Sequence, residues 1–331
     1  MKNDKRSVTM VDVAREAGVA LGTVSKVING LPVGESYRRK VEAAVQKLDY
    51  HVNPNAKFLK SERTNTIALI LPNTIIPFFA LLTQYVNMAL EKRGYKMMLC
   101  FTEYDHHREQ ELISMVVQNR VDGIIALTYD PRLEVPDNVP FVTVDRFLGG
   151  SVPCVASDNF TGGRLAAAKL AELGCHRVAC LQVGSVLTTE PNKRKDGFVS
   201  GCMTAGLTFK LCNPPDGATA EPFEVFLRQE LLETDTPLDG LFCSTDLVAY
   251  QAIGIIRSFG RRVPEDVQVI GFDGLRMLGD QEPVCSSIVQ PISELAETAV
   301  SIVISNDFAG LPPLICLPVT YRPGGTTREK D

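Results

Sequence analysis

Apolar residues recur at helical spacing near the start of the chain. The first apolar face consists of Met10, Val13, Ala14 and Ala17. Thr9 before it and Asp12 three residues later form a capping-box pattern, with Asp in place of the usual Glu. Gly18 follows where a left-handed C-cap residue is expected. The pattern therefore predicts a short helix with a marked start and end.

A second apolar face follows after a turn at residues 18–20. This helix is expected to bury Val24, Val27 and Ile28 and to end at Gly30. Its outward positions are Leu21, Gly22, Thr23, Ser25, Lys26 and Asn29. A third helical pattern contains Val41, Ala44, Val45 and Leu48. Two short helices joined by a tight glycine turn are typical of a helix-turn-helix, here expected within a three-helix head.

The pattern changes from about residue 66, where apolar runs alternate with longer amphipathic stretches. TIALILP precedes a helical stretch from Phe79 to Lys92, and YKMMLCF precedes a charged helix through Glu109 to Gln118. The alternation continues through VDGIIAL, restarts after VPFVTVD and ends at VQVIGFDG. Strands that alternate with helices of roughly ten or more residues form parallel sheets. Two such series predict two Rossmann-like α/β subdomains, with a ligand cleft at the carboxyl ends of their strands.

Charge is distributed unevenly along the 331 residues, whose formal net charge is −5. Residues 1–63 contain 12 Lys and Arg against 7 Asp and Glu, whereas the rest contains 22 against 32. A helix pair alone is also compatible with an ordinary helical subdomain. A basic helix-turn-helix on an acidic body instead indicates that only the head faces the phosphates of DNA. With 45% hydrophobic residues, the chain can bury a large core and is too long for one typical domain.

Several kinds of chemistry are disfavoured. Nine Cys are scattered, mostly in apolar runs, without a Cys-x-x-Cys pair, so we expect reduced core thiols rather than disulfides or zinc. His106 and His107 are adjacent and point in different directions on a helix, which favours a solvated helix start over a metal site. Neither G-x-G-x-x-G after a strand nor G-x-x-x-x-G-K-[ST] occurs, and the glycines of FTGGRLAAAKL stand at a helix start. We expect no metal, no cofactor and no enzymatic activity.

The polar, charged N-terminus has no apolar signal-peptide core, and no apolar run approaches the roughly 18 residues of a membrane span. We therefore expect a cytoplasmic protein without a membrane partner. Two competing interpretations fit the α/β pattern less well. A sugar-binding protein of transport would need an export signal, and a Rossmann-type enzyme would need a nucleotide motif or a nucleophile with its base.

Five segments together resemble the LacI/GalR family of bacterial transcriptional regulators: VTMVDVAREAGV, TVSKVING, RRKVEAAVQKLDYHVNPNAKFLKSERTNTIALILP, PFF at 77–79 and VPEDVQVIGFDG at 263–274. The resemblance spans nearly the whole chain. It implies a helix-turn-helix DNA-binding domain at 1–52, a hinge helix and linker at 53–64, and an effector-binding and dimerisation domain of periplasmic-binding-protein type at 65–331. The N-subdomain would comprise 65–158 and 291–319, and the C-subdomain 159–290 and 320–331. Crossings between them are expected near 157–160, 290–291 and Tyr321.

The resemblance also implies which residues contact operator DNA. Base edges would be read by Lys26, which suits guanine, and by Leu21, which suits a thymine methyl group, whereas Gly22 offers no side chain. The implied phosphate contacts are Thr9, Thr23, Ser25, Asn29, Arg38 and Tyr50. Thr9 and Tyr50 also have a purely structural interpretation, as a cap and a packing residue. Ala20 stands where the family commonly has a Ser N-cap, which weakens the helix start by about 1 kcal/mol.

The hinge helix would place Leu59 between base pairs of the minor groove as a wedge. Asn53, Ala56, Lys57 and Lys60 would lie beside it. Val52 departs from the family, which usually has Pro there, while Pro54 follows two residues later at a position that a first helical turn tolerates. A plain tether without a DNA role is the alternative for residues 60–65.

By the same resemblance, effector contacts would be made by Phe78, Phe79, Asp145, Arg194, Asp273 and Gln290. A sugar or sugar derivative is the effector that the family resemblance implies. A purine corepressor is disfavoured, because Thr188 stands where the purine repressor has an Arg for its ligand, and Ile76 departs from the Asn that commonly precedes Pro-Phe-Phe. The C-terminal GGTTREKD lacks the Leu heptads of a tetramerising coil, so a homodimer is expected. The alternatives are a cytoplasmic sugar-sensing binding protein and a ligand-independent regulator with a vestigial pocket.

Overall fold

The computed structural model describes residues 8–50, 63–128, 133–150, 152–183, 189–215, 220–276 and 283–328. The chain divides into two compact units, a head and a body, which meet between Thr64 and Asn65. Each unit has its own hydrophobic core.

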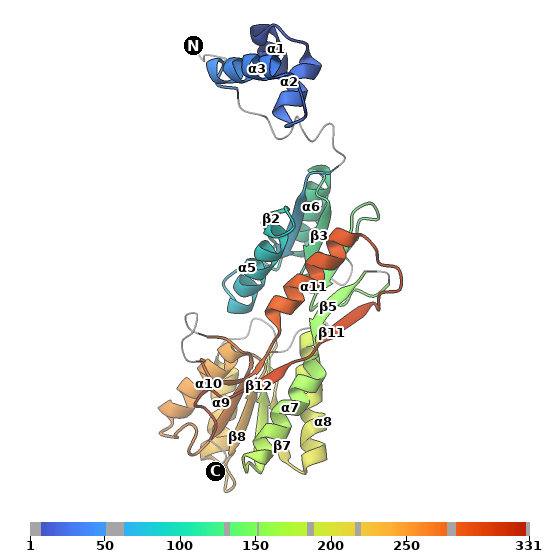
Figure 1. Ribbon diagram of the computed structural model, residues 1–331. Helices are drawn as coiled ribbons and strands as arrows, with labels where there is room; N and C mark the ends of the chain where they lie inside the picture. Colours follow the sequence, from blue (N-terminus) through green and yellow to red (C-terminus); the bar gives the residue numbers. More distant parts are fainter. Residues whose placement is uncertain are drawn as a thin grey trace. The chain divides into compact units, whose positions relative to one another are not determined.

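The head consists of three helices, α1 (Met10–Ala17), α2 (Leu21–Ile28) and α3 (Glu35–Lys47) (Figure 1). The expected capping box at the start of α1 is present, because the Thr9 and Asp12 side chains each bond the other residue's backbone N–H. Gly18 ends α1 at φ 62°, a left-handed conformation that glycine adopts without a steric penalty. The three predicted apolar faces meet in one core around Val13, Val24 and Val41.

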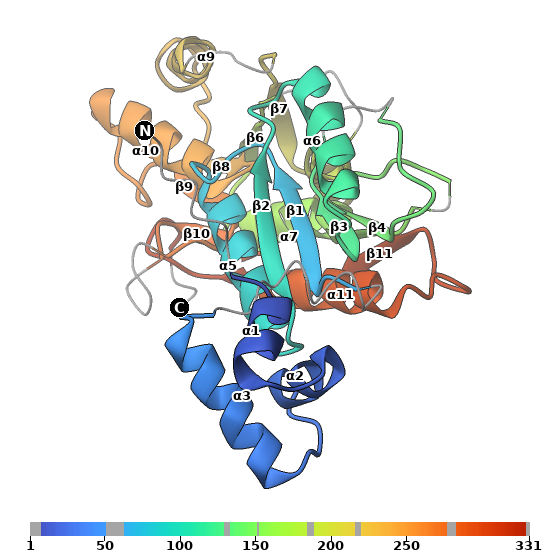
Figure 2. The same ribbon diagram turned by 90° about the horizontal axis from the view of Figure 1, so that it is seen from above.

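The first lobe of the body is a six-stranded, wholly parallel sheet. In spatial order its strands are β11 (Leu314–Leu317), β5 (Cys154–Ser157), β4 (Phe141–Val144), β3 (Gly123–Ala126), β1 (Thr66–Leu71) and β2 (Lys96–Phe101). Helices α5 (Pro77–Glu91) and α11 (Ile292–Ser305) cover one face, and α6 (His106–Gln118) covers the other (Figure 2). Successive residues of β1 therefore alternate between two cores, with Leu69 facing α5 and Ile70 facing α6.

The second lobe repeats this design. Its strands, in spatial order, are β12 (Thr320–Arg322), β10 (Ser286–Val289), β9 (Gln268–Asp273), β8 (Gly240–Cys243), β6 (Arg177–Leu181) and β7 (Thr208–Cys212). Only the pairing of β12 with β10 is antiparallel among these described strands. One face carries α7 (Asn159–Glu172) and α8 (Lys193–Ala205), the latter preceded by the 3₁₀ turn η1 (Glu190–Asn192). The other face carries α9 (Glu221–Leu232) and α10 (Asp246–Ser258).

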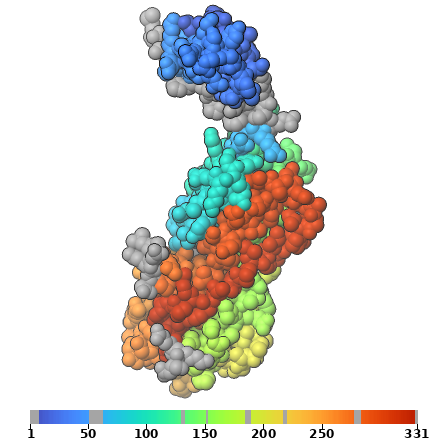
Figure 3. Space-filling view, viewed as in Figure 1, coloured from blue at the N-terminus to red at the C-terminus, as the bar shows by residue number. Residues whose placement is uncertain are grey.

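The chain passes between the two lobes three times. It leaves β5 of the first sheet for α7 of the second lobe, returns from β10 to α11, and passes from β11 to β12 at Pro318 and Val319. The last passage lies slightly before Tyr321, because Tyr321 is already paired with Ile288 in the second sheet. In Figure 3 the C-terminal segment, coloured red, runs along the body from one lobe to the other. The first lobe is thus completed by a helix and a strand from the end of the chain.

Gly163 of the FTGGRLAAAKL segment and Gly197 of α8 allow α7 and α8 to pack backbone against backbone. A Cβ atom on Gly163 would lie 1.9 Å from the carbonyl oxygen of Arg194. A Cβ atom on Gly197 would lie 1.9 Å from the carbonyl oxygen of Phe160. Since no side chain fits at either position, these glycines serve helix packing, and the main chain of Arg194 is held directly against α7.

Other expectations concern cysteine, metals and membranes. All nine cysteines are free thiols, seven of them buried. Burial raises the pKa of the Cys180 thiol, for example, so this thiol stays protonated and unreactive. Across the described ranges, no helix is long and apolar enough to cross a membrane. His106 is the first residue of α6 and directly follows the N-cap Asp105, which agrees with the helix start predicted here.

Candidate functional site

The outward face of α2 is the first candidate site. Ala20 precedes the helix without a side-chain cap, so the predicted weak start is confirmed. Leu21 is 48% exposed, Lys26 is exposed, and the space around a Cβ atom on Gly22 is empty within 4 Å. Thr23 and Ser25 are half-buried. The exposed part of the helix is therefore apolar at its N-terminal end and cationic one turn later.

Four residues expected to meet phosphate have identifiable local surroundings. Thr9 Oγ1 donates to Asp12 Oδ2 over 2.6 Å, and Asn29 Nδ2 donates to the Ser25 carbonyl oxygen over 2.7 Å. Tyr50 is only 7% exposed and packs in the core of the head, whereas Arg38 is half-buried. The structural roles of Thr9 and Tyr50 are thus present whether or not they touch DNA. The expected hinge residues lie outside the described residues: Asn53, Ala56, Lys57, Leu59 and Lys60.

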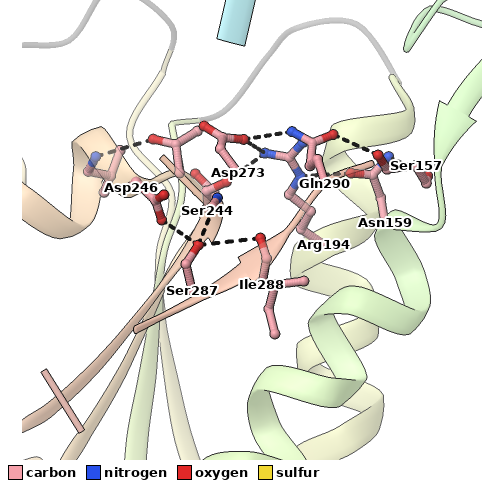
Figure 4. Close-up of polar contacts among 12 residues, drawn as sticks. Ser157, Asn159, Arg194, Ser244, Asp246, Asp273, Ser287, Ile288 and Gln290 are labelled. Carbon is pink, nitrogen blue, oxygen red and sulfur yellow. Dashed lines mark hydrogen bonds and ion pairs between the residues drawn. The ribbon is translucent and has the colours of Figure 1, made fainter. Parts of the chain in front are cut away.

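The second candidate site is centred on Arg194, near the start of α8. Its guanidinium Nε donates to Asn159 Oδ1 over 2.7 Å, and Nη1 donates to the Ser244 carbonyl oxygen over 2.7 Å. Nη1 also lies 3.6 Å from Asp273 Oδ1, and the guanidinium stacks 3.8 Å from the centre of the Phe272 ring. Figure 4 shows Arg194 near Asn159, Ser244 and Asp273. The side chain is fixed by four different contacts.

Two further residues extend this arrangement to the first lobe. Gln290 Nε2 donates to Asp273 Oδ1 over 2.7 Å, and Ser157 Oγ donates to Gln290 Oε1 over 2.8 Å (Figure 4). Asn159 Nδ2 also donates to the Ser157 carbonyl oxygen over 2.9 Å. Because Ser157 ends β5 of the first sheet, these bonds connect the lobes. We call Ser157, Asn159, Arg194, Asp273 and Gln290 the inter-lobe network.

Asp246 begins α10 and stabilises the segment that follows β9. Its carboxylate accepts from the Leu275 backbone N–H over 2.6 Å and from Ser287 Oγ over 2.6 Å. Burial raises the pKa of Asp246 to about 6, although these donors oppose the shift. Asp246 therefore ties the segment that follows Asp273 to the strand β10.

Asp145 lies at the carboxyl end of β4 in the first lobe. It is 3% exposed, and its Oδ1 atom has no hydrogen-bond partner. Burial is the main influence and raises the pKa of this carboxyl, while Arg194 and Arg146 lower it and Glu190 raises it further. Burial likewise raises the pKa of Asp273 against the opposing effect of Arg194. Both carboxyls thus become easier to protonate than in water.

Of the eight described non-glycine residues with positive φ, Asp145 and Asp273 are the two that are buried. Asp145 has φ 57° and Asp273 has φ 117°, values that L-residues rarely adopt. Such strain costs of order 1–3 kcal/mol and is concentrated at sites of function. Two strained, buried carboxyls therefore stand at strand ends, one in each lobe.

Phe78 and Phe79, which the resemblance implies as effector contacts, lie at the start of α5 in the first lobe. Each is 5% exposed, and they pack edge to face with ring centres 5.9 Å apart in the core of the first lobe. Both rings belong to the hydrophobic core cluster formed by α5, α11 and the first sheet. The residues that the sequence analysis missed are Ser157, Asn159 and Ser244. The expected crossing at 157–160 was the available signal for the first two.

A helical head with an exposed second helix, joined to a two-lobed body with a polar inter-lobe site, is the architecture of a ligand-responsive DNA-binding regulator. Residues 9–53 match the model of bacterial regulatory proteins of the lacI family, and residues 167–327 match the periplasmic binding protein-like domain. The chain belongs to the LacI family, and it is a DNA-binding transcriptional regulator.

Named relatives cover most of the chain. It is 31% identical to the sucrose operon repressor of Pediococcus pentosaceus, over 89% of this chain and 91% of that one. It is 32% identical to a ribose operon repressor of Halalkalibacterium halodurans, over 90% of each. The solved lac repressor dimer bound to operator and the anti-inducer ONPF is 21% identical, with a TM-score of 0.81 over 97% of this chain and 99% of that one, and shows the shared fold.

Proposed function

We propose that this regulator represses transcription and that a neutral, hydroxyl-rich small molecule, a sugar or sugar derivative, controls its operator affinity from between the lobes. The observation that carries the proposal is the inter-lobe network, whose bonds join Ser157 of the first sheet to Asp273 of the second through Gln290. A ligand that bonds these groups would replace contacts that hold the lobes in one arrangement. The ligand would thereby bind one arrangement of the two lobes more tightly than another, and allosteric control requires such a difference in affinity.

The chemistry of the site suits sugar hydroxyl groups. Asp145 and Asp273 supply acceptors, Gln290 supplies both donor and acceptor atoms, and Arg194 supplies donors. The unpartnered Oδ1 atom of Asp145 is the acceptor that a ligand would satisfy first. Arg194 is already matched by Asp273, so it is not an unpaired cation for an anionic ligand. Phe78 and Phe79 would act by shaping the first lobe beneath the ligand.

The head would read DNA with the exposed side of α2. Lys26 would donate to guanine in the major groove, and Leu21 would contact a thymine methyl group. Contacts to phosphate would fix the orientation of the head and involve Thr9, Thr23, Ser25, Asn29, Arg38 and Tyr50. The hinge, with Leu59 as the minor-groove wedge, completes the proposal. We further propose that the protein acts in the cytoplasm as a homodimer on a pseudo-palindromic operator, since two heads match two half-sites.

A thermal-unfolding screen against neutral sugars, sugar alcohols and nucleosides tests the effector site. A ligand at 100 times its dissociation constant adds about 2.7 kcal/mol of stability, which for a body of this size corresponds to roughly 5–10 °C. Arg194→Met and Asp145→Asn should abolish the response, whereas Arg257→Gln, an exposed change on α10, should retain it. A full response in both site variants would show that the ligand binds elsewhere.

A companion experiment tests the DNA-binding face. The full-length protein first selects operator sequences from random DNA. The Lys26→Ala variant should bind these sequences about 1–3 kcal/mol more weakly and should show a relaxed preference at one base pair. Arg120→Ala, on the body, is the control that should leave affinity unchanged. Equal binding by the wild type and by Lys26→Ala would contradict the assignment of α2.

A further inference from the structure

The chain enters the body at a point that one carboxylate holds in place. Asn65 is the first residue of the body, and its backbone N–H donates to Asp122 Oδ2 over 2.7 Å. The Asn65 carbonyl oxygen accepts from the Lys96 N–H over 2.8 Å. The Asp122 N–H in turn donates to the Thr66 carbonyl oxygen over 2.8 Å. Both backbone polar groups of Asn65 are thus bonded within the first lobe, directly before β1 begins.

The backbone bends at Asn65. Its φ is 50°, a left-handed value that asparagine adopts more readily than most L-residues. Since strands have a φ of roughly −120°, the chain leaves the line of β1 at this residue. The bond to Asp122 spans 57 positions of sequence, so the bend depends on a tertiary contact as well as on local preference. Asp122 therefore helps to set the direction in which the residues before Asn65 leave the body.

The main chain next to Asp122 has little freedom to move. Gly123 follows it as the first residue of β3 and pairs with Ile67 of β1. A Cβ atom on Gly123 would lie 2.5 Å from Val303 Cγ2 of α11 and 3.2 Å from Ile67 Cδ1. The start of β3 is therefore packed closely against both β1 and the last turn of α11, and Asp122 is held at a defined place beside them.

Helix α11 connects this place with the inter-lobe network. It begins at Ile292, whose N–H donates to the carbonyl oxygen of Gln290, a member of the network, over 2.9 Å. Its buried face, which includes Leu295 and Val303, packs in the core of the first lobe. A helix of 14 residues is about 20 Å long. Because a close-packed core deforms little, a shift of the first lobe at Gln290 also shifts Asp122.

The second lobe contains the same arrangement without a connection to the head. Asp239 precedes Gly240, the first residue of β8, just as Asp122 precedes β3. Its carboxylate accepts from the backbone N–H groups of His176 and Arg177, over 2.8 and 3.0 Å. There the bonded segment joins α7 to β6, and neither of its two bonded residues has a positive φ. The arrangement belongs to the design of both lobes, and in the first lobe it acts on the residue that joins body and head.

We propose that Asp122 is a positioning residue for operator binding, which fixes the exit of the chain from the body so that the head follows the movement of the first lobe. Without the bond, the backbone at Asn65 would be ordered only when the protein binds DNA. Ordering the backbone of one additional residue on binding weakens affinity about five- to thirtyfold. The regulatory part of this proposal rests on the proposed control by lobe arrangement, whereas its effect on operator affinity does not.

The test measures the operator affinity of the full-length protein by fluorescence anisotropy, on sequences that the wild type selects from random DNA. Asp122→Ala removes the acceptor and should weaken binding about five- to thirtyfold. Asp122→Asn keeps an acceptor oxygen and should restore most of the affinity. Asp239→Ala is the matched control, because it removes the same kind of bond from the second lobe. This control should lower Tm to a similar extent and bind the operator like the wild type.

A further variant acts on the donor of the bond. Asn65→Pro removes the N–H group and forces a negative φ, so it should weaken operator binding at least as much as Asp122→Ala. Asn65 is exposed, so the body of this variant is expected to fold even if Asp122→Ala does not.

Each outcome decides the proposal. Weak binding by Asp122→Ala and Asn65→Pro, with recovery in Asp122→Asn and wild-type affinity in Asp239→Ala, supports it. Wild-type affinity in either Asp122→Ala or Asn65→Pro overturns it. An equal loss in Asp239→Ala also overturns it, because the effect would then follow stability alone. These affinities are measured without effector, so an unsuccessful sugar screen would count against the neutral-sugar site and leave this result unaffected.

Discussion

Replacing Arg194 by Met should destabilise the body strongly. Arg194 is 4% exposed, and its removal leaves the carboxylate of Asp273, also 4% exposed, without its cation. Removing one member of a buried ion pair typically costs about 3–5 kcal/mol, because the remaining charge stays desolvated. For a body of this size that corresponds to a fall in Tm of roughly 6–20 °C. Met keeps much of the aliphatic volume, so the loss reports mainly on charge and hydrogen bonding.

A double-mutant cycle isolates the pair. Asp273→Asn alone should also destabilise, since it leaves Arg194 buried without its acid. The double variant should be more stable than the sum of the two single effects predicts, by about 1–3 kcal/mol. Guanidinium unfolding of the full-length protein, followed by far-ultraviolet circular dichroism, measures these values. Intrinsic tryptophan fluorescence is not an option because the chain contains no Trp.

The pH dependence provides an internal check on the cycle. Without Arg194, which lowers the pKa of Asp273, burial should raise that pKa further. The carboxyl of the Arg194→Met variant then takes up a proton more readily in the folded state than in the unfolded chain. The penalty of Arg194→Met should therefore shrink as the pH falls. Strictly additive single effects, together with a penalty that does not change with pH, would refute the view that Arg194 and Asp273 act as a pair.

Two further predictions concern packing and titration. Gly197→Ala should lower the free energy of unfolding by about 1–3 kcal/mol or more, because its Cβ atom would lie 1.9 Å from the Phe160 carbonyl oxygen. Gly254→Ala is the control on α10, where the space is open, and it should be neutral or stabilising. Calorimetric unfolding compares the two variants, and equal Tm values would contradict the packing argument. The folded-state pKa of Asp246, about 6 against 3.8 in the unfolded chain, means that the folded protein binds this proton more tightly. The free energy of unfolding should therefore fall as the pH rises through this window, and a pH profile of denaturant unfolding that is equally steep in Asp246→Asn would contradict the assignment.

The order of elements was predictable because each carries a local signal. Periodicity indicated the three head helices, and the cap of α1 was visible as Thr9 and Asp12. The two α/β series gave two parallel sheets, because strands separated by helices have few other arrangements. The role of the FTGGRLAAAKL glycines as packing positions was less visible. It depends on Gly163 lying against the main chain of Arg194 and on Gly197 lying against that of Phe160, contacts between two helices that the local sequence does not reveal.

The candidate site was harder to predict than the fold. Arg194, Asp273 and Gln290 were expected from their surrounding motifs, and the structure brings them together. Ser157 and Asn159 carry no distinctive pattern of their own, since single polar residues at strand ends are common. They join the network only because the chain crosses between lobes at that point. The burial of Phe78 and Phe79 likewise depends on α11, which comes from the far end of the sequence.

The open space at Gly22 bears on how this regulator could acquire new targets. A glycine inside a helix lowers stability by roughly 0.5–1 kcal/mol relative to alanine, and at Gly22 no close contact requires the absence of a Cβ atom. Alanine introduced at Gly22 would thus stabilise the helix, and its Cβ atom would meet no other atom within 4 Å in the free head. A substitution at this single position could therefore change which operator the head recognises without first destabilising the fold. Gly22 is thus a position at which the set of regulated genes could change in evolution.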